Sequence, residues 1–400
     1  MPSMTGPLSH ITVLDLSRIM AGPWSSQTLA DLGAEVIKVE RTGVGDDTRR
    51  WGPPYLKASD GEETGESGYF LSVNRGKKSV EIDLASPEGQ ETVRALARQA
   101  DVVLENFKAG SLKRYGLGPD DLRALNPRLI YCSITGFGQD GPMAKDVAYD
   151  FMIQAMGGLL SVTGVPDGEP GAGPQKVGVP IVDIMTGMYA TVAILAALAR
   201  RSETGRGDTI DIAMLDVAAA TLANQAMNYL VSGVAPKRAG NKHPNIQPQD
   251  IFPVRDGHIV IAVGNDEQFG RFSDALGMPD LADDPRYATN KARVENLDTL
   301  HPLICARLQE RDLADWRQVL TERNVPCAPI NTVPQVLAEP QVRHREMLRD
   351  LPHPLSGSVP SVVSPMRFAE APLAFETAPP LLGQHTAEVL SRLKPPHDDG

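Results

Sequence analysis

The sequence predicts an α/β fold with a large domain built on an open, parallel, Rossmann-like sheet, and a smaller α+β domain. The first observation is that roughly the first 220 residues alternate short β-branched segments with helical segments, as βαβ units do. The second is a change of texture near Asn228, where a connection rich in Pro and Asn begins. A chain of 400 residues also favours two domains over one.

The first two strands and the helix between them are marked by their residue types. An apolar segment over residues 10–17 predicts a buried strand, and "EVIKVE" over 35–40 predicts the next one. Between them, Pro23 falls in the first turn of a predicted helix over 22–34, and Gly33 falls near its end. We therefore expect two parallel strands joined by this helix.

The same alternation continues along the chain. Ser86 and Pro87 are suited to the cap and the first position of a helix over 86–100, and the Gly205 region ends a long apolar helix over 184–207. Further strands are predicted over 79–84, 101–107, 128–134 and 208–215, and a short helix over 118–127. We expect a large Rossmann-like α/β domain over 1–225, a small domain with linkers over 226–330, and a C-terminal segment over 331–400 that returns to the large domain.

Charge and composition exclude several classes of partner. The net charge of -11 argues against a nucleic-acid or anionic-membrane surface, because phosphate groups would be repelled. The longest apolar run, Met188 to Leu198, is shorter than the roughly 20 residues that cross a bilayer, so we expect a buried helix and no membrane span. The three cysteines are widely spaced, and the N-terminus lacks the basic segment followed by an apolar segment that is typical of a signal peptide. Both observations indicate a cytoplasmic protein.

Common catalytic motifs are missing from the sequence. The turn after the first strand, "SRIMAGPW", has one Gly where a dinucleotide fingerprint needs three, and there is no phosphate-binding P-loop motif. No nucleophile elbow and no metal-binding histidine spacing occur either. We therefore expect no nicotinamide and no metal.

Two acidic residues stand in apolar surroundings. Asp150 follows Tyr149 and precedes an apolar helix that ends in glycines, and Asp183 interrupts the apolar run "GVPIVDIMTGMYA". Each is explained by helix capping, worth about 1 kcal/mol. Asp183 has a second explanation: a carboxylate kept ionised by a helix N-terminus and stripped of water by apolar neighbours is a usable nucleophile.

An ordered set of segments resembles a known family over nearly the whole chain. The segments are "VLDLSRIMAGPWSSQTLADLGAEVIKVER", "GDDTRRWGPP", "YFLSVNRGKKSVEIDL", "DVVLENF", "YCSITGFGQDGP", "YDFMIQAMGGLLSVTG", "VDIMTGMYA", "GNDEQF" and "PLLGQHT". Together they resemble the class III CoA-transferases, the CaiB/BaiF group, and within it the succinyl-CoA:dicarboxylate branch. The resemblance implies a catalytic aspartate at Asp183, which attacks an acyl-CoA thioester and passes through anhydride and aspartyl-CoA thioester intermediates.

The resemblance also implies a CoA site, with CoA and acyl-CoA as substrates. The positions it carries over lie near strand ends, where open α/β sheets bind ligands. Each basic residue among them would alone be explained as a solvated surface charge. They are Arg41, Asn74, Arg75, Lys77, Lys78, Asn106, Phe107, Arg114, Tyr149 and Asp150.

Departures from the family patterns leave alternatives. Racemases of this family carry a His where this chain has Tyr149, which disfavours an α-methylacyl-CoA racemase or isomerase that would use Asp183 and Asp150 as acid and base. A catalytically silent acyl-CoA-binding subunit and a nicotinamide oxidoreductase are further alternatives. The glycine run of formyl-CoA transferases is missing, and "VGNDEQF" is similar to the dicarboxylate branch. The resemblance finally implies an interlocked homodimer acting on a small carboxylic acid.

Overall fold

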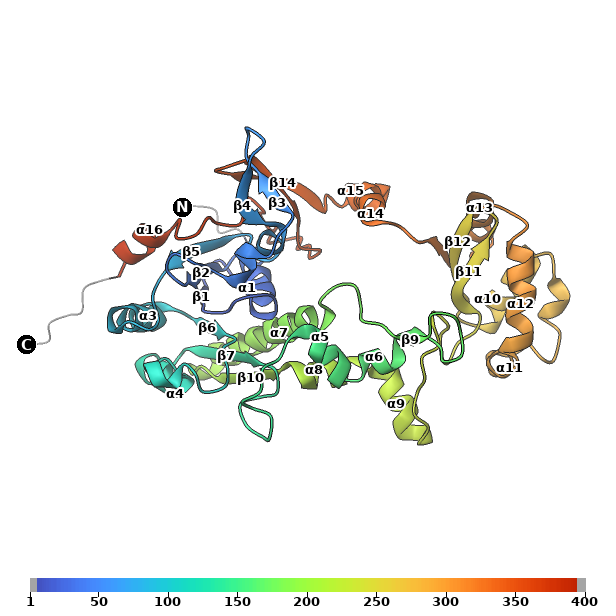
Figure 1. Cartoon of the computed structure of the whole chain (residues 1–400), viewed down its shortest axis with the longest axis horizontal. Helices are drawn as coiled ribbons and strands as arrows, with labels where there is room; N and C mark the ends of the chain where they lie inside the picture. The colour runs from blue at the N-terminus through green and yellow to red at the C-terminus, as the bar shows by residue number, and fades with distance from the viewer. Residues whose placement is uncertain (1–5, 394–400) are drawn as a thin grey trace, which may run out of the picture. The chain divides into compact units, whose positions relative to one another are not determined.

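The computed structural model describes residues 6–393 and divides into two compact units (Figure 1). The first unit runs to Leu159 and also contains Lys176–Val231 and the chain from Pro340; the second contains Leu160–Gln175 and Ser232–Glu339. Leu160–Gln175 differs from the predicted boundaries. It belongs to the second unit because the Arg238 guanidinium donates a hydrogen bond to the Val165 carbonyl at 3.0 Å. The outer limits of the predicted domains, 1–5 and 394–400, lie outside the described residues.

The first unit is built on a six-stranded parallel sheet, which confirms the predicted open α/β sheet (Figure 1). The strand order is β10-β7-β6-β1-β2-β5, so the order reverses between β1 and β6. In open α/β sheets, ligands bind outside the carboxyl ends of the strands at such a reversal. The strands are β1 (Thr12–Asp15), β2 (Glu35–Glu40), β5 (Lys77–Glu81), β6 (Val102–Glu105), β7 (Ile130–Thr135) and β10 (Thr209–Ala213).

Alternate residues of these strands enter two separate cores. Val13 packs with the helices on one face, and its neighbour Leu14 packs with those on the other, as the two-residue period of a strand requires. The first core includes residues of α1 (Ala21–Asp31), α5 (Asp150–Met156), α7 (Ile181–Thr204) and α8 (Met214–Thr221). The second includes residues of α3 (Pro87–Gln99), α4 (Pro119–Leu125) and α16 (Thr386–Ser391).

Helix ends follow the expected chemistry. The Ser86 hydroxyl accepts the Gly89 N–H at the start of α3, and Gly205 ends α7 with a φ of 69°, in the left-handed region that favours glycine. The predicted long apolar helix over 184–207 is present as α7, but the expectation that it is buried holds for only one side of it. It has 24 residues, is long and apolar enough by length and composition to cross a membrane, and leaves Tyr189 and Val192 exposed while Ile194 is buried.

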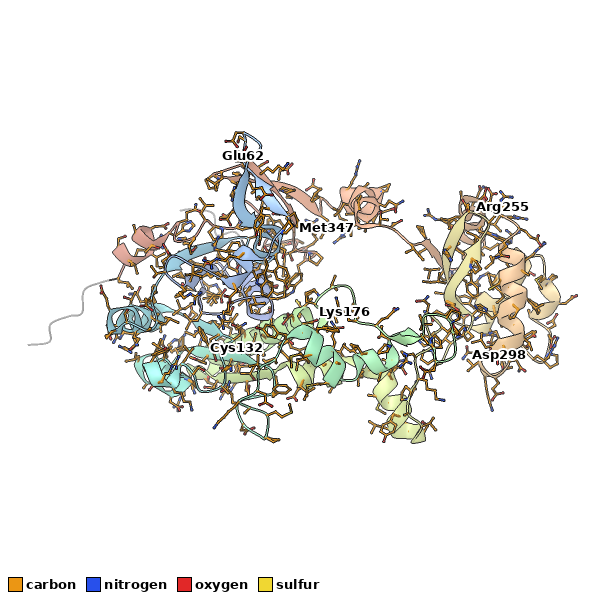
Figure 2. All side chains as sticks on the ribbon, viewed as in Figure 1. Glu62, Cys132, Lys176, Arg255, Asp298 and Met347 are labelled. Carbon is orange, nitrogen blue, oxygen red and sulfur yellow. The ribbon has the colours of Figure 1, made fainter. Side chains whose placement is uncertain are left out.

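The remaining elements of the first unit lie around the sheet. Two antiparallel hairpins are formed by β3 (Tyr55–Lys57) with β4 (Glu63–Ser67), and by β14 (Leu348–His353) with β15 (Gly357–Val362). The described helices not yet named are α2 (Gly68–Leu71), α9 (Ala223–Ser232), α15 (Pro340–His344) and the short 3₁₀ segments Asp47–Arg50 and Lys113–Tyr115. Cys132 is buried in β7 (Figure 2), and all three cysteines are free.

The second unit has its own sheet and core. Its antiparallel strands, in the order β11-β12-β13, pack a core around Phe252, Phe272 and Trp316. The strands are β11 (Gln249–Val254), β12 (Gly257–Ala262), β13 (Cys327–Pro329) and the short pair β8 (Gly164–Val165) and β9 (Gly173–Pro174). The helices are α6 (Leu159–Val162), α10 (Asp266–Ala275), α11 (Asn290–Glu295), α12 (Leu297–Leu308), α13 (Leu313–Glu322), α14 (Val333–Ala338) and the 3₁₀ segment Pro279–Leu281.

Candidate active site

Two neighbouring cavities open at the carboxyl ends of β1 and β6. One, of about 150 Å³, is lined by Asp183 together with residues that follow both strands. The other, of about 240 Å³, is lined by basic and aromatic side chains. Arg18 and Phe107 line both, so the cavities are adjoining parts of one cleft. Its position matches the point of strand-order reversal where open sheets bind ligands.

Asp183 lies in the first turn of α7, but it is not the residue that caps this helix. The capping group is Asp150, from the start of α5: its Oδ1 accepts the N–H groups of Val182 at 2.8 Å and of Asp183 at 3.1 Å. Its Oδ2 accepts a hydrogen bond from the Gln154 amide at 2.6 Å. The prediction that each acid caps the helix it precedes is therefore wrong for both: Asp150 is the first residue of α5 and caps α7 instead, and the Asp183 carboxylate caps neither helix.

The pKa of Asp183 is raised to about 7, first by burial and second by the negative charge of Asp150. This corrects the expectation that the helix N-terminus keeps Asp183 fully ionised. Burial disfavours the charged form, and a second carboxylate nearby adds repulsion. A carboxylate with a pKa near neutrality is ionised in about half the molecules at pH 7, and it is more basic and more nucleophilic than a solvated one.

Tyr69 lies near enough to Asp183 to feel its charge, and Trp51 contacts Tyr69; sequence reasoning assigned neither residue a role. Burial, followed by the charge of Asp183, raises the pKa of Tyr69 to about 12, so its phenol stays protonated as a hydroxyl donor. The Trp51 ring meets the Tyr69 ring edge-on, with centroids 5.0 Å apart. Both residues fall within motifs that carry the resemblance, "GDDTRRWGPP" and "YFLSVNRGKK", which is the only signal that pointed to them.

The larger cavity gathers three of the predicted CoA-binding residues. Arg41 follows β2, Phe107 follows β6, and Arg114 lies with its guanidinium 4.5 Å from the centre of the Tyr115 ring. Acidic side chains also line this cavity, but three of them are held in ion pairs: Glu40 with Arg49, Asp46 with Lys38, and Asp47 with Arg18. Two of these pairs use the cavity's own cations, Lys38 and Arg18, so Arg41 and Arg114 are the cations best placed to meet phosphate groups, and the rings of Phe107 and Tyr115 can meet an adenine.

Asn106 and Tyr149 line the smaller cavity with Asp183. The Asn106 amide, however, is already used within the protein. Its Oδ1 accepts the Arg18 N–H at 2.9 Å, and its Nδ2 donates to the Arg18 carbonyl at 2.7 Å. Asn106 therefore shapes the cavity wall, whereas Tyr149, whose side chain is exposed, presents its ring to the opening.

Four predicted CoA-binding residues lie elsewhere. The "NRGKK" segment enters β5, of which Lys77 and Lys78 are the first two residues, so it stands at the amino end of a parallel strand, away from the edge where the cavities open. Their placement does not support the predicted contact with phosphates, because each side chain has a partner inside the chain. The pairs are Asn74 with Lys77 at 2.9 Å, Lys77 with Asp15 at 3.3 Å, Arg75 with Asp31 at 2.7 Å, and Lys78 with Glu35 at 2.6 Å.

The segment "GNDEQF" begins α10 in the second unit. The Asn265 side chain accepts the Gln268 N–H at 2.8 Å, and Asp266 pairs with Arg293 at 2.7 Å. These contacts give the segment a role in starting the helix. Within residues 6–393, no cluster of His, Cys, Asp and Glu side chains has the arrangement of a metal site.

Comparison with known proteins identifies the group to which these features correspond. A family model described as CoA-transferase family III matches residues 8–386. A succinate–glutarate CoA-transferase of Agrobacterium fabrum is 48% identical over 98% of this chain and 97% of its own, and a succinyl-CoA:glutarate CoA-transferase of Mus musculus is 42% identical over 97% and 86%. The crystal structure of a CaiB/BaiF family protein from Brucella suis has a TM-score of 0.85, with 49% identity over 98% of this chain and all of the other.

Proposed function

The chain belongs to CoA-transferase family III, and we propose that it transfers CoA from succinyl-CoA to glutarate or a similar small dicarboxylic acid. The observation that carries the proposal is Asp183, a desolvated carboxylate at the start of α7 in a cavity that adjoins a second one, lined by Arg41 and Arg114 among others. The relatives named for succinyl-CoA and glutarate support the choice of substrates. Lys108, which lines the smaller cavity, is suited to the free carboxylate that both substrates carry.

We propose that the reaction passes through covalent intermediates on Asp183. Its carboxylate attacks the thioester carbonyl, the C–S bond breaks, and CoA leaves as a thiolate, which gives a mixed anhydride. The thiolate then attacks the aspartyl carbonyl, releases succinate and forms an aspartyl-CoA thioester. The acceptor carboxylate then attacks the aspartyl-CoA thioester and releases the CoA thiolate, which gives a second mixed anhydride. The thiolate attacks the acceptor's carbonyl in this anhydride, so the new acyl-CoA leaves and the Asp183 carboxylate is restored. Water would hydrolyse either intermediate, which explains the need for a desolvated site.

The proposal is tested by incubating the purified protein with succinyl-CoA, acetyl-CoA or formyl-CoA and a panel of carboxylic acids. We expect glutaryl-CoA to form from succinyl-CoA and glutarate, and dicarboxylic acids to be better acceptors than monocarboxylic acids of equal length. Products are separated by liquid chromatography and identified by mass spectrometry. Thioester hydrolysis without transfer, or tight CoA binding without turnover across the whole panel, would contradict the proposal; the second result would favour a silent acyl-CoA-binding subunit.

The pKa of Asp183 predicts the pH dependence of transfer. The nucleophile is the ionised form, and its pKa is about 7, so activity is present above pH 7 and is lost as the pH falls. Below pH 7, kcat/KM for succinyl-CoA should fall by about tenfold per pH unit, because that is how the ionised fraction falls. The measurement is an initial-rate profile between pH 5 and pH 9 in buffers of constant ionic strength. A profile that stays flat down to pH 5 would show that an ordinary, solvated carboxylate acts.

Arg41 and Arg114 in the larger cavity predict where the CoA phosphates bind. Arg41→Ala and Arg114→Ala should each raise KM for succinyl-CoA by about tenfold, the effect of losing roughly 1.4 kcal/mol of charge-assisted contact. KM for glutarate should change by less than about twofold, since these arginines line only the larger cavity.

Lys113→Ala is the matched control for Arg114→Ala. Lys113 is an exposed cation next to Arg114 in the chain, and it does not line the larger cavity. We expect its KM for succinyl-CoA to be unchanged. Equal effects of the Lys113 and Arg114 variants would indicate a general effect of net charge instead of a phosphate site.

A racemase or isomerase is the alternative function, and the contacts of Asp150 disfavour it. The Asp150 carboxylate already accepts three hydrogen bonds, two from the first turn of α7 and one from Gln154, so it is not placed to exchange a proton with a substrate. Incorporation of deuterium from heavy water at the α-carbon of an acyl-CoA would favour this alternative.

We also propose that the protein is a cytoplasmic homodimer. Large apolar side chains are exposed in this single chain on α5, α7 and α9, and a second copy would remove them from water. They include Phe151, Met156, Tyr189, Val192, Leu230 and Val231. Sedimentation equilibrium at micromolar concentration should give about twice the 43.0 kDa mass of the chain.

A further inference from the structure

The loop between β1 and α1 is held in place by side chains at every step. From the Ser17 N–H to the Ile19 N–H, all five successive main-chain polar groups are bound by side chains from elsewhere or, for the first, from Asp15. The Ser17 N–H donates to Asp15 Oδ1 at 2.9 Å, and the Ser17 carbonyl accepts a hydrogen bond from Lys38 Nζ at 2.8 Å. The Arg18 N–H donates to Asn106 Oδ1 at 2.9 Å, and the Arg18 carbonyl accepts from Asn106 Nδ2 at 2.7 Å. The Ile19 N–H donates to the Asp46 carboxylate at 3.2 Å.

Ile19 needs this support because its backbone is strained. Its φ is 73°, in the left-handed region that a β-branched residue almost never adopts. Such a conformation costs on the order of 1–3 kcal/mol and persists only where the surroundings impose it. The loop also approaches the helix that follows it: a side chain at Gly22 would place its Cβ 2.3 Å from Ser17. The chain is therefore forced through one particular turn at Ile19.

Asp46 is the group that holds Ile19, and it is itself firmly fixed. Its carboxylate pairs with the Lys38 ammonium at 2.9 Å, and both side chains are at most 1% exposed. The Thr48 hydroxyl and N–H donate to Oδ1 at 2.8 and 3.0 Å. Burial alone would raise the pKa of Asp46, but Lys38 and Thr48 outweigh it, so the pKa lies below its ordinary value and the carboxylate stays charged.

The strained turn is also part of the candidate active site. Arg18, Ile19, Met20 and Ala21 line the same cavity as Asp183. A wall that must hold a thioester within reach of a nucleophile has to be placed to within a fraction of an ångström, since a misplacement of about 1 Å can cost 10²-fold in rate.

We propose that Asp46 is a positioning residue for CoA transfer, which fixes the Arg18–Ile19 turn in its left-handed conformation against the cavity that contains Asp183. The inference rests on the proposed function and extends it to a residue that takes no part in bond making or breaking and acts through the main chain of Ile19. The presence of Ile instead of Gly at this left-handed position then has a physical explanation. The buried Asp46–Lys38 ion pair imposes on Ile19 a conformation that glycine adopts without strain.

A double-mutant cycle between Asp46 and Ile19 tests the proposal. Asp46→Asn removes the charge that holds the turn, and we expect kcat for succinyl-CoA and glutarate to fall by at least about tenfold. Ile19→Gly makes the left-handed conformation free of strain, so the turn no longer depends on Asp46. In the Ile19→Gly background, Asp46→Asn should therefore lower kcat by less than about threefold.

Thr48→Val is the milder variant, for the case in which Asp46→Asn does not fold. It removes a hydroxyl that orients Asp46 and leaves the ion pair with Lys38 intact. We expect Thr48→Val to lower kcat by less than Asp46→Asn does, and we expect this loss to be smaller again in the Ile19→Gly background. Asp31→Asn is the matched control, because it breaks the buried Asp31–Arg75 ion pair of the same unit without touching the turn. Its effect on kcat should be the same with Ile19 and with Gly at that position.

The outcomes separate this inference from the proposed function. Transfer by the wild type, with a cost of Asp46→Asn that is equal in both backgrounds, would overturn the inference alone. Rescue by Ile19→Gly would support it, since general destabilisation is not relieved by a glycine in one turn. Failure of the wild type to transfer CoA at all would overturn the proposed function.

Discussion

Asp183→Ala is expected to lower the rate of CoA transfer by at least about 10⁴-fold, because the carboxylate is the nucleophile in both halves of the proposed reaction. Without it, only binding and electrostatic contributions remain. The measurement is the initial rate of glutaryl-CoA formation. Mass spectrometry adds a direct test: after succinyl-CoA and then hydroxylamine, a hydroxamate should be found on Asp183 of the wild type and on no residue of the variant.

Asp183→Asn is the control that separates lost chemistry from lost folding. The pKa of Asp183 is about 7 in the folded protein and about 3.9 in an unfolded chain, so its ionisation costs stability as the pH rises from 4 through 7. Asparagine has no such cost. The variant should therefore melt higher than the wild type at pH 8, by roughly 2 °C or more, with a smaller difference at pH 5. Undiminished transfer by Asp183→Ala would contradict the proposed mechanism.

The parts of the fold that were predictable depend on local signals. Strand segments such as "EVIKVE", and the cap at Ser86, act through neighbours in the sequence, and the structure has β2 and α3 where they indicate. The segment Leu160–Gln175 was assigned to the wrong unit because its place depends on Arg238, more than sixty residues later in the chain. Local patterns carry no information about such a contact.

The site was predictable to the extent that residues follow strands. Arg41, Phe107 and Asp183 reach the cleft because they stand at the carboxyl edge or at a helix start. Lys77 and Arg75 do not, because "NRGKK" lies at the amino end of its strand; the motif supplied the residue types but not the direction in which the chain enters the sheet. The left-handed turn at Ile19 had no signal at all, since a β-branched residue there contradicts local preference and is imposed by Asp46.

Asp150→Ala is expected to lower transfer by about 10²-fold, although Asp150 forms no bond to the substrate in the proposed mechanism. Its Oδ1 holds the N–H groups of Val182 and Asp183, so the alanine leaves the first turn of α7 without its cap. Loss of a cap costs about 1 kcal/mol in stability, which is too little to unfold the protein. The larger cost falls on the rate, because the helix turn that aims Asp183 becomes free to shift.

Asp150→Asn divides the two roles of this carboxylate. The amide oxygen can still accept the two N–H groups, so kcat at high pH should stay within about tenfold of the wild type. The charge is gone, and with it the second cause of the raised pKa of Asp183. The acid limb of the rate profile should therefore move below pH 7, yet remain above the ordinary Asp pKa because burial is the larger cause. An acid limb that stays at pH 7 in the Asn variant would show that the charge of Asp150 does not raise the pKa of Asp183. Full activity in the Ala variant would show that Asp150 does not position it. The rate of the Ala variant and the acid limb of the Asn variant together measure how Asp150 sets the position and the basicity of Asp183.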